Sequence, residues 1–377
     1  MEFNTKTLGV RDHAPLFALI DRDGKTSVLR DLAGKAIVLI FYVKDDIPAC
    51  EALACAFKDR ATEFDRLDTR IISISIDTPQ DRAVFAAKHG IPYALLSDPD
   101  LRASKLYGVC QEIQRDRRTD IEFERVIFLL DPNLRIVKIY SLRQMPEPVT
   151  EILEDIKHLL PKEAPRHISM QAPVLLIPNV ISPNTCRDLI EIWSTQGHDD
   201  SGFMKREGES TVGYIDYSHK VRKDHFIEAA QVRDFIDRTM QKLVFPEIEK
   251  AFDYEVTRRE AYKIACYESE RGGYFRPHRD NTTGGTKHRK FAMTLNLNVG
   301  EYEGGYLRFP EYAPHLYKPE TGSAVIFSCS LLHEATDVTA GQRFALLSFF
   351  YSDREAEQRD AYEQRAQNDY DKFVVKT

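Results

Sequence analysis

The stretch GGYFRPHRDN, residues 272–281, places a histidine and an aspartate two positions apart. On an extended segment, side chains two positions apart project to the same face, so His278 and Asp280 can hold one metal ion together. A second histidine, His333, lies in the later stretch SCSLLHEATDV, after strand patterns that could fold back across a β-sandwich. The sequence therefore predicts a metal site in the second half of the chain.

The residue types at this site indicate iron rather than structural zinc. Two imidazoles and one carboxylate on one face of an ion leave its other positions open, as Fe(II) oxygenases require to bind a cosubstrate and O₂. A lone His-x-Asp is weak, because such tripeptides arise often by chance. Arg343 adds weight: it starts the strand pattern QRFALLSFF, and a buried guanidinium there needs an anionic partner. The distal carboxylate of 2-oxoglutarate could be that partner; the alternative is a surface salt bridge.

Three stretches, ACYESERGGYFRPHRDN, EGGYLRF and ETGSAVIFSCSLLHEATDVTAGQRFALLSFFYSD, occur in a characteristic order and spacing. Over residues 173–353 the sequence thereby resembles the prolyl 4-hydroxylase-like 2-oxoglutarate/Fe(II) oxygenases. The resemblance implies a double-stranded β-helix of jelly-roll type with supporting helices. It also implies Fe(II), 2-oxoglutarate, O₂ and ascorbate as cofactors, His278, Asp280 and His333 as iron ligands, and Arg343 as the residue that binds 2-oxoglutarate.

Further pocket residues are expected from the same resemblance. Tyr267 matches a family tyrosine that hydrogen-bonds the cosubstrate; the alternative is a tyrosine packed in the core. Thr294 and Asn296 lie on the strand that should line the pocket, and Asn296 stands where some relatives have a tyrosine. The substrate is not fixed by the fold. A prolyl residue of a protein is the expectation by analogy, with free amino acids and small metabolites open.

The first half of the chain has a different pattern. Continuous apolar runs such as AIVLIFYV and RIISISID alternate with helical patterns from residue 36 to residue 160, which is typical of an α/β domain with a largely buried sheet. The stretch PKEAPRHISMQAP, residues 161–173, has no period and reads as a linker. Because 377 residues exceed what one core usually supports, we expect two domains, residues 1–162 and 163–377.

The second half begins with helical patterns. Ser182 and Pro183 are expected to start a helix through CRDLIEIW, since serine is a favoured N-cap and proline fits the first turn. A long helical pattern covers residues 226–252, and strand patterns follow. The polar tail, residues 354–372, fits a terminal surface helix.

Two cysteines of the first half form a candidate redox site. In FYVKDDIPACEALACAFKD, Cys50 follows a buried strand near a helix N-terminus, where the dipole favours a thiolate. Cys55 could resolve a sulfenic acid on Cys50 if the helix partly unwinds. The alternative for Cys55 is a small buried hydrophobic residue.

Residues 7–160 resemble a peroxiredoxin of the AhpC/TSA type, closest to the bacterioferritin-comigratory subgroup. The resemblance implies a thioredoxin-like fold, Cys50 as peroxidatic cysteine, Cys55 as resolving cysteine and Arg125 as the arginine that activates thiolate and peroxide. The family's Pro-x-x-x-Thr-x-x-Cys is here Val43-x-x-x-Ile47-x-x-Cys50, and isoleucine cannot hydrogen-bond a peroxide. An efficient peroxidase, a redox sensor and a structural or dimerising domain therefore remain open.

Composition and charge limit the partners. The chain is 42% hydrophobic and 29% charged, without an apolar run near the ~20 residues of a membrane span. A net charge of −7 argues against a large nucleic-acid surface. The basic cluster at residues 219–223 is expected to be solvated surface. No secretory signal is visible, so a cytoplasmic setting is expected, with a protein or small-molecule substrate and a homodimer as candidate partners.

Two rival functions use the same residues differently. In one, the whole chain is a peroxide-reducing or redox-sensing protein, and the iron-type domain serves only binding. In the other, the chain is a protein-interaction factor with both sites vestigial. The complete set of His278, Asp280, His333 and Arg343 favours an oxygenase, since a decayed site should have lost some of them.

Overall fold

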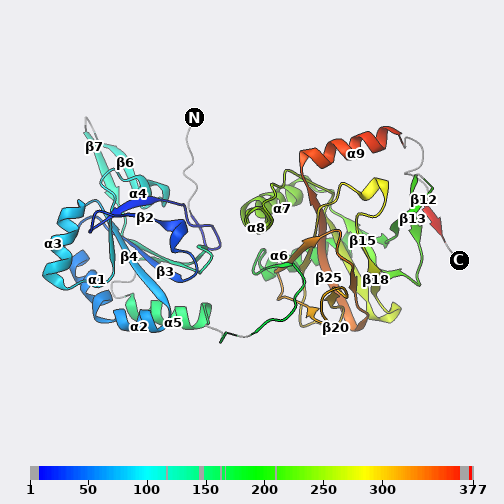
Figure 1. Cartoon of the computed structure of the whole chain (residues 1–377), viewed down its shortest axis with the longest axis horizontal. Helices are drawn as coiled ribbons and strands as arrows, with labels where there is room; N and C mark the ends of the chain where they lie inside the picture. The colour runs from blue at the N-terminus through cyan, green and yellow to red at the C-terminus, as the bar shows by residue number, and fades with distance from the viewer. Residues whose placement is uncertain are drawn as a thin grey trace. The chain divides into compact units, whose positions relative to one another are not determined.

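A computed structural model of the chain describes residues 8–115, 118–143, 148–161, 164–165, 167–208, 210–365 and 373–375. The chain divides into two compact units, residues 1–166 and 167–377 (Figure 1). Residues 162, 163 and 166 of the expected linker, and residues 366–372 of the expected terminal helix, lie outside the described residues. No helix in the described ranges is long and apolar enough to cross a membrane.

The first unit is built on a mixed sheet. Within the described residues its seven strands follow the order β2-β1-β5-β4-β3-β8-β9. β3 runs parallel to β4 and β4 parallel to β5, whereas β8 lies antiparallel to β3. The strands are β1 (Ala18–Asp21), β2 (Thr26–Val28), β3 (Ala36–Phe41), β4 (Thr69–Ser75), β5 (Ala94–Ser97), β8 (Val126–Leu130) and β9 (Ile136–Ser141).

All residues of β3 are buried, as the apolar run predicts for a strand covered on both faces. Val38 and Ile40 pack in one core, and Ile37 and Leu39 pack in the other. The helices are α1 (Pro48–Asp59), α2 (Ala61–Arg66), α3 (Pro79–His89), α4 (Arg102–Leu106) and α5 (Val149–Leu159). The expected thioredoxin-like α/β class is confirmed.

Two details of the first unit differ from the sequence patterns. The helical pattern of residues 51–64 is interrupted at Arg60, whose backbone (φ −111°, ψ 8°) leaves the helical region and separates α1 from α2. A hairpin of β6 (Cys110–Arg115) and β7 (Arg118–Phe123) was not expected, because its alternation is mostly polar and carries little apolar signal.

The second unit contains two main antiparallel sheets, as a jelly roll requires. Within the described residues, one has the order β10-β23-β19-β25-β17-β15-β11, with β16 and β20 also paired to β25, and the other has the order β14-β18-β24-β21-β22. Their strands are β10 (Leu175–Ile177), β11 (Asp199–Asp200), β14 (Lys220–Val221), β15 (Lys223–Phe226), β16 (Arg258–Arg259), β17 (Lys263–Glu268), β18 (Tyr274–His278), β19 (Phe291–Asn296), β20 (Tyr302–Gly304), β21 (Leu307–Arg308), β22 (Leu316–Tyr317), β23 (Ala324–Ser328), β24 (His333–Ala335) and β25 (Val338–Tyr351). A third, small sheet holds β12 (Phe203–Glu207), β13 (Ser210–Ile215) and β26 (Phe373–Val375). The expected jelly-roll class is confirmed.

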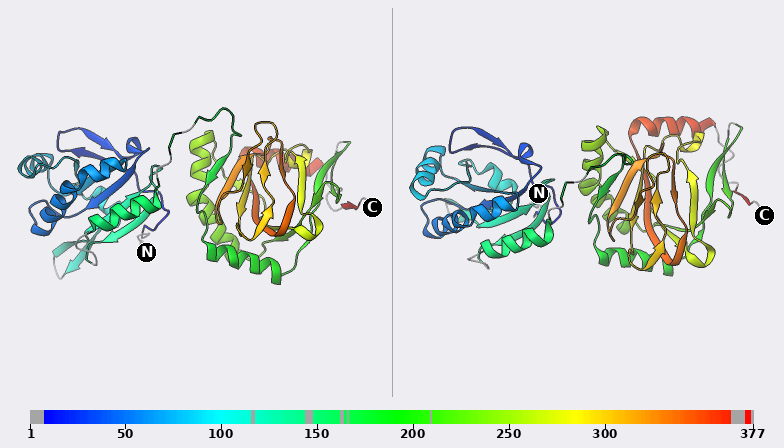
Figure 2. Two further views of the ribbon diagram at one scale, coloured as in Figure 1. Left: turned by 90° about the horizontal axis from the view of Figure 1, so that it is seen from below. Right: turned by 60° about the horizontal axis from the view of Figure 1, so that its bottom comes forward.

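Helices support this sandwich, and the green helices lie beside its strands in both views of Figure 2. α6 (Pro183–Thr195) begins as expected, because the Ser182 side chain accepts a hydrogen bond from the Thr185 N–H. The long pattern of residues 226–252 is instead two helices, α7 (Ala230–Leu243) and α8 (Phe245–Phe252). Pro246, in the first turn of α8, lacks an N–H and could not continue α7. The polar tail forms α9 (Asp353–Arg365).

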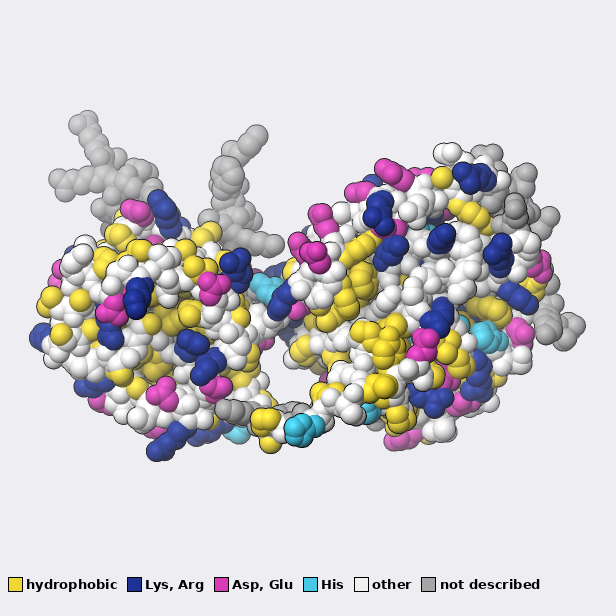
Figure 3. Space-filling view, in the orientation of Figure 1, with side chains coloured by type: hydrophobic (Ala, Val, Ile, Leu, Met, Phe, Trp, Pro, Cys, Tyr) yellow, Lys and Arg dark blue, Asp and Glu magenta, His cyan; other side chains and the backbone are white. Residues whose placement is uncertain are grey.

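The surface of each unit mixes charges of both signs. On the face that Figure 3 shows, basic and acidic side chains lie interspersed over each unit rather than in one large field. The basic residues that matter for the chemistry below lie inside the second unit.

Candidate metal centre

The three predicted ligands come together at one end of two paired strands. His278 is the last residue of β18 and His333 is the first residue of β24, and the two residues are direct partners in the antiparallel register. The pairing is irregular between Phe275 and His278, as at a β-bulge, which re-aims a side chain. Ligand atoms of His278, Asp280 and His333 all lie within 4.8 Å of one another.

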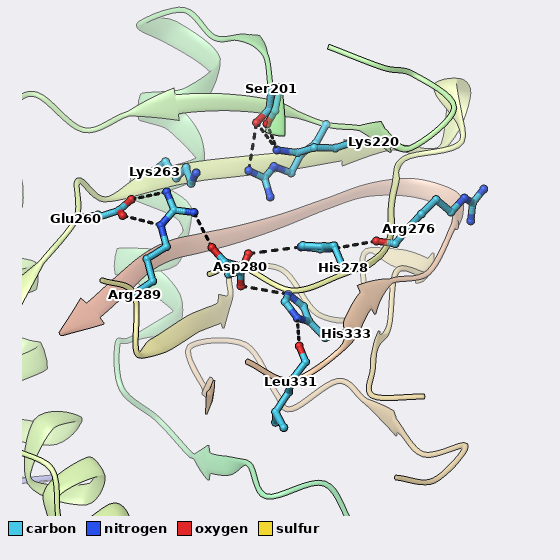
Figure 4. Close-up of polar contacts among 12 residues, drawn as sticks. Ser201, Lys220, Glu260, Lys263, Arg276, His278, Asp280, Arg289, Leu331 and His333 are labelled. Carbon is cyan, nitrogen blue, oxygen red and sulfur yellow. Dashed lines mark hydrogen bonds and ion pairs between the residues drawn. The ribbon is translucent and has the colours of Figure 1, made fainter. Parts of the chain in front are cut away.

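Both histidines are oriented by the backbone (Figure 4). The Nδ1 of His278 lies 2.8 Å from the carbonyl oxygen of Arg276, and the Nδ1 of His333 lies 3.0 Å from that of Leu331. Because a carbonyl can only accept, each Nδ1 carries the proton and each Nε2 keeps its lone pair. These Nε2 atoms lie 3.5 and 3.3 Å from the two carboxylate oxygens of Asp280.

Asp280 is fixed from a second side. Its N–H donates to the carbonyl of Cys329, and the guanidinium of Arg289 reaches its carbonyl oxygen at 3.4 Å. Arg289 also forms a two-pronged pair with Glu260, at 2.6 and 3.0 Å. Burial raises the pKa of the Glu260 carboxyl, but the charge of Arg289 outweighs it and brings this pKa down to about 2. Such outer contacts orient metal ligands.

The protonation states suit a divalent cation. Burial, and then the nearby His333, lower the pKa of His278 to about 4, so that its imidazole is neutral near pH 7. Burial raises the pKa of Asp280, yet the neighbouring His333 and His278, with the Arg289 cation nearby, hold it below its usual range. Neutral imidazole and ionised carboxylate are the forms that bind metal. Two imidazoles and one carboxylate fit Fe(II).

The predicted cosubstrate residues lie in the same pocket. Arg343 on β25 is the direct partner of Tyr267 on β17, and its guanidinium lies 5.0 Å from the Tyr267 ring centroid. Arg343 is only 3% exposed, and its Nε has no hydrogen-bond partner among the described residues. The alternative of a surface salt bridge is therefore wrong. Arg343 is a buried cation that can take an anion.

The two strand candidates of the sequence differ in position. Thr294 lines the pocket, whereas Asn296 is turned to its margin: its Nδ2 donates to the Pro319 carbonyl at 2.7 Å, and its Oδ1 lies 3.5 Å from Arg343. Asn296 thus contacts the guanidinium and is not among the residues that line the pocket. The pocket has a volume of about 890 Å³ and includes His278, Asp280 and His333 in its lining. Such a volume lies within the range of small-molecule sites.

The basic cluster at residues 219–223 contradicts the expectation of a solvated surface. Lys220 and Arg222 are 4% and 7% exposed, and both line the pocket. The expectation is wrong because the two residues lie at and beside short strands whose alternation turns them inward, while Lys223 turns away and pairs with Glu268. A run of charged residues in the sequence does not show which of its side chains are turned inward.

The cysteine site differs from the sequence expectation in its electrostatics. Cys50 lies in the first turn of α1, as expected, but it is fully buried. Burial raises the pKa of its thiol, although backbone contacts from Lys44 and the charge of Arg125 act in the opposite direction. The expected low-pKa thiolate is therefore wrong. The helix dipole is outweighed by desolvation.

Cys55 lies on the same intact helix, five positions after Cys50, and both cysteines are free. It is half-buried, with its Sγ 3.8 Å from the Nδ1 of His89. The other ring nitrogen of His89 lies 3.6 Å from the Glu51 carboxylate. Sequence reasoning missed this histidine, which ends α3 with no motif around it, and it missed Glu260 and Arg289 beside the iron site for the same reason.

A thioredoxin-like unit with a buried helix-terminal cysteine, followed by a jelly roll with a two-histidine, one-carboxylate cluster, defines a two-domain oxidoreductase. Residues 10–139 match the AhpC/TSA family, and residues 262–351 match the 2OG-Fe(II) oxygenase superfamily. The chain belongs to the AhpC/TSA peroxiredoxins through its first unit and carries a 2OG-Fe(II) oxygenase domain in its second.

Known relatives match the first unit. Peroxiredoxin Bcp of Bacillus subtilis is 32% identical over 156 residues, which are 41% of this chain and 99% of that protein. A putative peroxiredoxin bcp of Coxiella burnetii is 31% identical over 147 residues, 39% of this chain and 97% of that protein. A solved structure of Xanthomonas campestris peroxiredoxin Q is 27% identical, with a TM-score of 0.36, and covers 38% of this chain and 90% of that one.

Proposed function

We propose that the second unit is an Fe(II)- and 2-oxoglutarate-dependent oxygenase that hydroxylates a C–H bond of its substrate. The observation that carries this proposal is the convergence of two imidazoles, each held by a backbone carbonyl, and one carboxylate in a pocket with the buried Arg343, whose Nε has no hydrogen-bond partner among the described residues. A decayed site would not keep both the ligands and their supports.

Each residue has a separate task in this proposal. His278, Asp280 and His333 hold the iron from one side and leave room for cosubstrate on the other. When bound, the iron supplies the O₂ chemistry that couples decarboxylation of 2-oxoglutarate to substrate hydroxylation. Arg343 binds the distal carboxylate of 2-oxoglutarate with Tyr267 beside it. Ascorbate is the expected reductant.

Succinate formation tests this function. The full chain with Fe(II), 2-oxoglutarate and O₂ should release succinate, and the reaction should stop without Fe(II) or in Asp280→Ala, which removes one of three ligands. His315→Ala, at an exposed histidine outside the site, is the matched control and should keep the activity. Unchanged succinate release by Asp280→Ala would exclude the proposed site.

We propose a second, thiol-based function for the first unit, because it belongs to the AhpC/TSA family and holds Arg125 near Cys50. The raised pKa of Cys50 and the isoleucine at position 47 favour slow oxidation over efficient peroxide turnover. A protein or small-molecule substrate for the oxygenase, with a prolyl residue among the candidates, and a cytoplasmic setting complete the proposal.

A further inference from the structure

A group of buried cations lines the same pocket beside the cosubstrate residue Tyr267. Lys220 on β14, Arg222 between β14 and β15, and Lys263 on β17 form what we call the cationic wall. Lys220 and Arg222 are buried, and the side chain of Lys263 is 18% exposed. Buried cations normally have a carboxylate each, because an unpaired charge away from water is costly.

Among the described residues, one carboxylate, Asp224, pairs with cations of the wall. Asp224 forms a two-pronged pair with Arg222, at 2.7 and 2.6 Å. Lys263 lies at 3.8 Å from the same carboxylate. In the part of the chain that the structure describes, Lys220 donates to two neutral oxygens, at 2.8 Å to Ser201 Oγ and 2.6 Å to the Gly202 carbonyl. Burial lowers the pKa of both lysines and the charge of Arg222 lowers it further, while the Asp224 carboxylate acts in the opposite direction.

The other carboxylates that line the pocket do not neutralise the charge of the cationic wall. Among the carboxylates that line the pocket in the described ranges, Asp199 is exposed, Asp200 pairs with Arg271 at 2.8 Å, and Asp280 belongs to the metal cluster. Asp224 is therefore the carboxylate left for the wall. The neighbouring pair of Glu260 with Arg289 is neutral by itself.

The wall adjoins both halves of the proposed active site. The Lys220 ammonium lies 4.7 Å from the centroid of the Phe275 ring, which stacks on His278 with centroids 3.4 Å apart. On the other side, Arg222 donates to the Tyr267 hydroxyl at 3.3 Å. Figure 4 shows Lys220 and Lys263 on strands next to the metal cluster. A molecule bound at the wall would thus lie within reach of the reacting centre.

The cosubstrate leaves the wall unbalanced. Under the proposed function, 2-oxoglutarate uses Arg343 for its distal carboxylate and the iron for its other end. We propose that the substrate itself carries an anionic oxygen group, a carboxylate or a phosphate, which binds to Lys220, Lys263 and Arg222 and holds the substrate over the iron. This inference rests on the proposed oxygenase function for its orientation, but anion binding at the wall can be measured without turnover.

The test is a titration of the full chain with inorganic phosphate, and separately with acetate, at constant ionic strength and saturating 2-oxoglutarate. Calorimetry should show one anion site per chain. Lys220→Met and Lys263→Met, which each remove a cation and leave the Arg222 and Asp224 pair intact, should each weaken the preferred anion at least tenfold. Lys250→Met, at an exposed lysine on α8, is the matched control. Whichever anion binds more tightly, phosphate or acetate, shows whether the anionic group of the substrate is a phosphate or a carboxylate.

Affinity for 2-oxoglutarate, measured in the same variants, separates the wall from the cosubstrate site. It should be unchanged in Lys220→Met and Lys263→Met. Anion binding that is absent, or equal in all variants, would overturn the proposal, and so would a tenfold loss of 2-oxoglutarate affinity in the lysine variants. Wall-dependent anion binding in a protein that forms no succinate would support the anion site and reject the oxygenase function instead. Circular dichroism and thermal unfolding check that each variant is folded.

Discussion

At the scale of single residues, the chemistry of a buried ionisable side chain depends on whether it stays charged and whether that charge has a partner. Arg343 and Cys50 are both buried, yet burial has opposite consequences for the charge of the two side chains. A guanidinium stays charged when buried and so attracts an anion. A thiol stays protonated when buried and so loses reactivity. Arg343 therefore favours chemistry in the second unit, and Cys50 argues against fast chemistry in the first unit.

Replacing Arg343 with alanine should raise the KM for 2-oxoglutarate far more than it lowers iron binding. Losing one partner of a buried charge pair costs about 3–5 kcal/mol, and each 1.4 kcal/mol is about tenfold in affinity. We therefore expect an increase of roughly two to three orders of magnitude in KM, measured by succinate formation at varied cosubstrate. An unchanged KM would mean that another cation, such as one of the wall, binds 2-oxoglutarate.

Alkylation of Cys50 should depend on pH as expected for a raised pKa. Burial favours the neutral thiol, so the rate with iodoacetamide should reach half its maximum above the ordinary value of about 8.5. The same shift stabilises the fold at lower pH, and this contribution is lost as pH rises from the ordinary pKa through the raised one. Peptide mapping with Cys50→Ser as reference measures the site. Half-maximal labelling near pH 7 would contradict the buried-thiol account.

At the scale of elements, helix starts matter most. The N-cap of α1 is Ile47, which precedes Pro48, is 36% exposed and makes no side-chain cap hydrogen bond. The N-cap of α6 is Ser182, whose side chain does cap its helix. Because Ile47 has no hydroxyl, α1 has no side-chain cap. The first unit also lacks the hydroxyl that the peroxiredoxin resemblance places near the cysteine.

Ile47→Thr should stabilise the first unit and accelerate oxidation of Cys50. A threonine N-cap contributes about 0.5–2 kcal/mol, and little burial is lost at this exposed position. Denaturant unfolding measures the first effect and stopped-flow peroxide consumption the second, with Cys50→Ser as the control. If the threonine changes neither rate nor stability, and Cys50→Ser consumes peroxide equally, the first unit is a structural or dimerising module.

The sequence predicted elements well where pattern and end signals agree. Strand β3 and helix α6 could be predicted because a continuous apolar run and a Ser-Pro start are strong signals. The candidate metal ligands could be predicted because residue type and spacing carry the chemistry. The cationic wall could not, since burial of Lys220 and Arg222 depends on short strands, β14 and β15, that have no apolar pattern of their own. Contacts far apart in sequence, such as Glu260 with Arg289, have no local signal either.

At the scale of the whole molecule, each unit has its own hydrophobic core. One set of core residues lies within β3, α1 and α5, and another lies within α6, α7 and the strands of the jelly roll. Because each core lies within one unit, substitutions in the two units are expected to act independently. Substitutions at the iron site should therefore leave the first unit folded, and Cys50→Ser should leave iron binding intact.

The most direct test of the central claim is anaerobic binding of Fe(II) and 2-oxoglutarate to the full chain, followed by visible absorption and metal analysis. Wild type and Cys50→Ser should each bind one Fe(II) per chain and develop an Fe(II)-dependent absorption on addition of 2-oxoglutarate. Asp280→Ala should lose both. One Fe(II) per chain with full absorption in Asp280→Ala would contradict the account, because iron would then be held outside His278, Asp280 and His333.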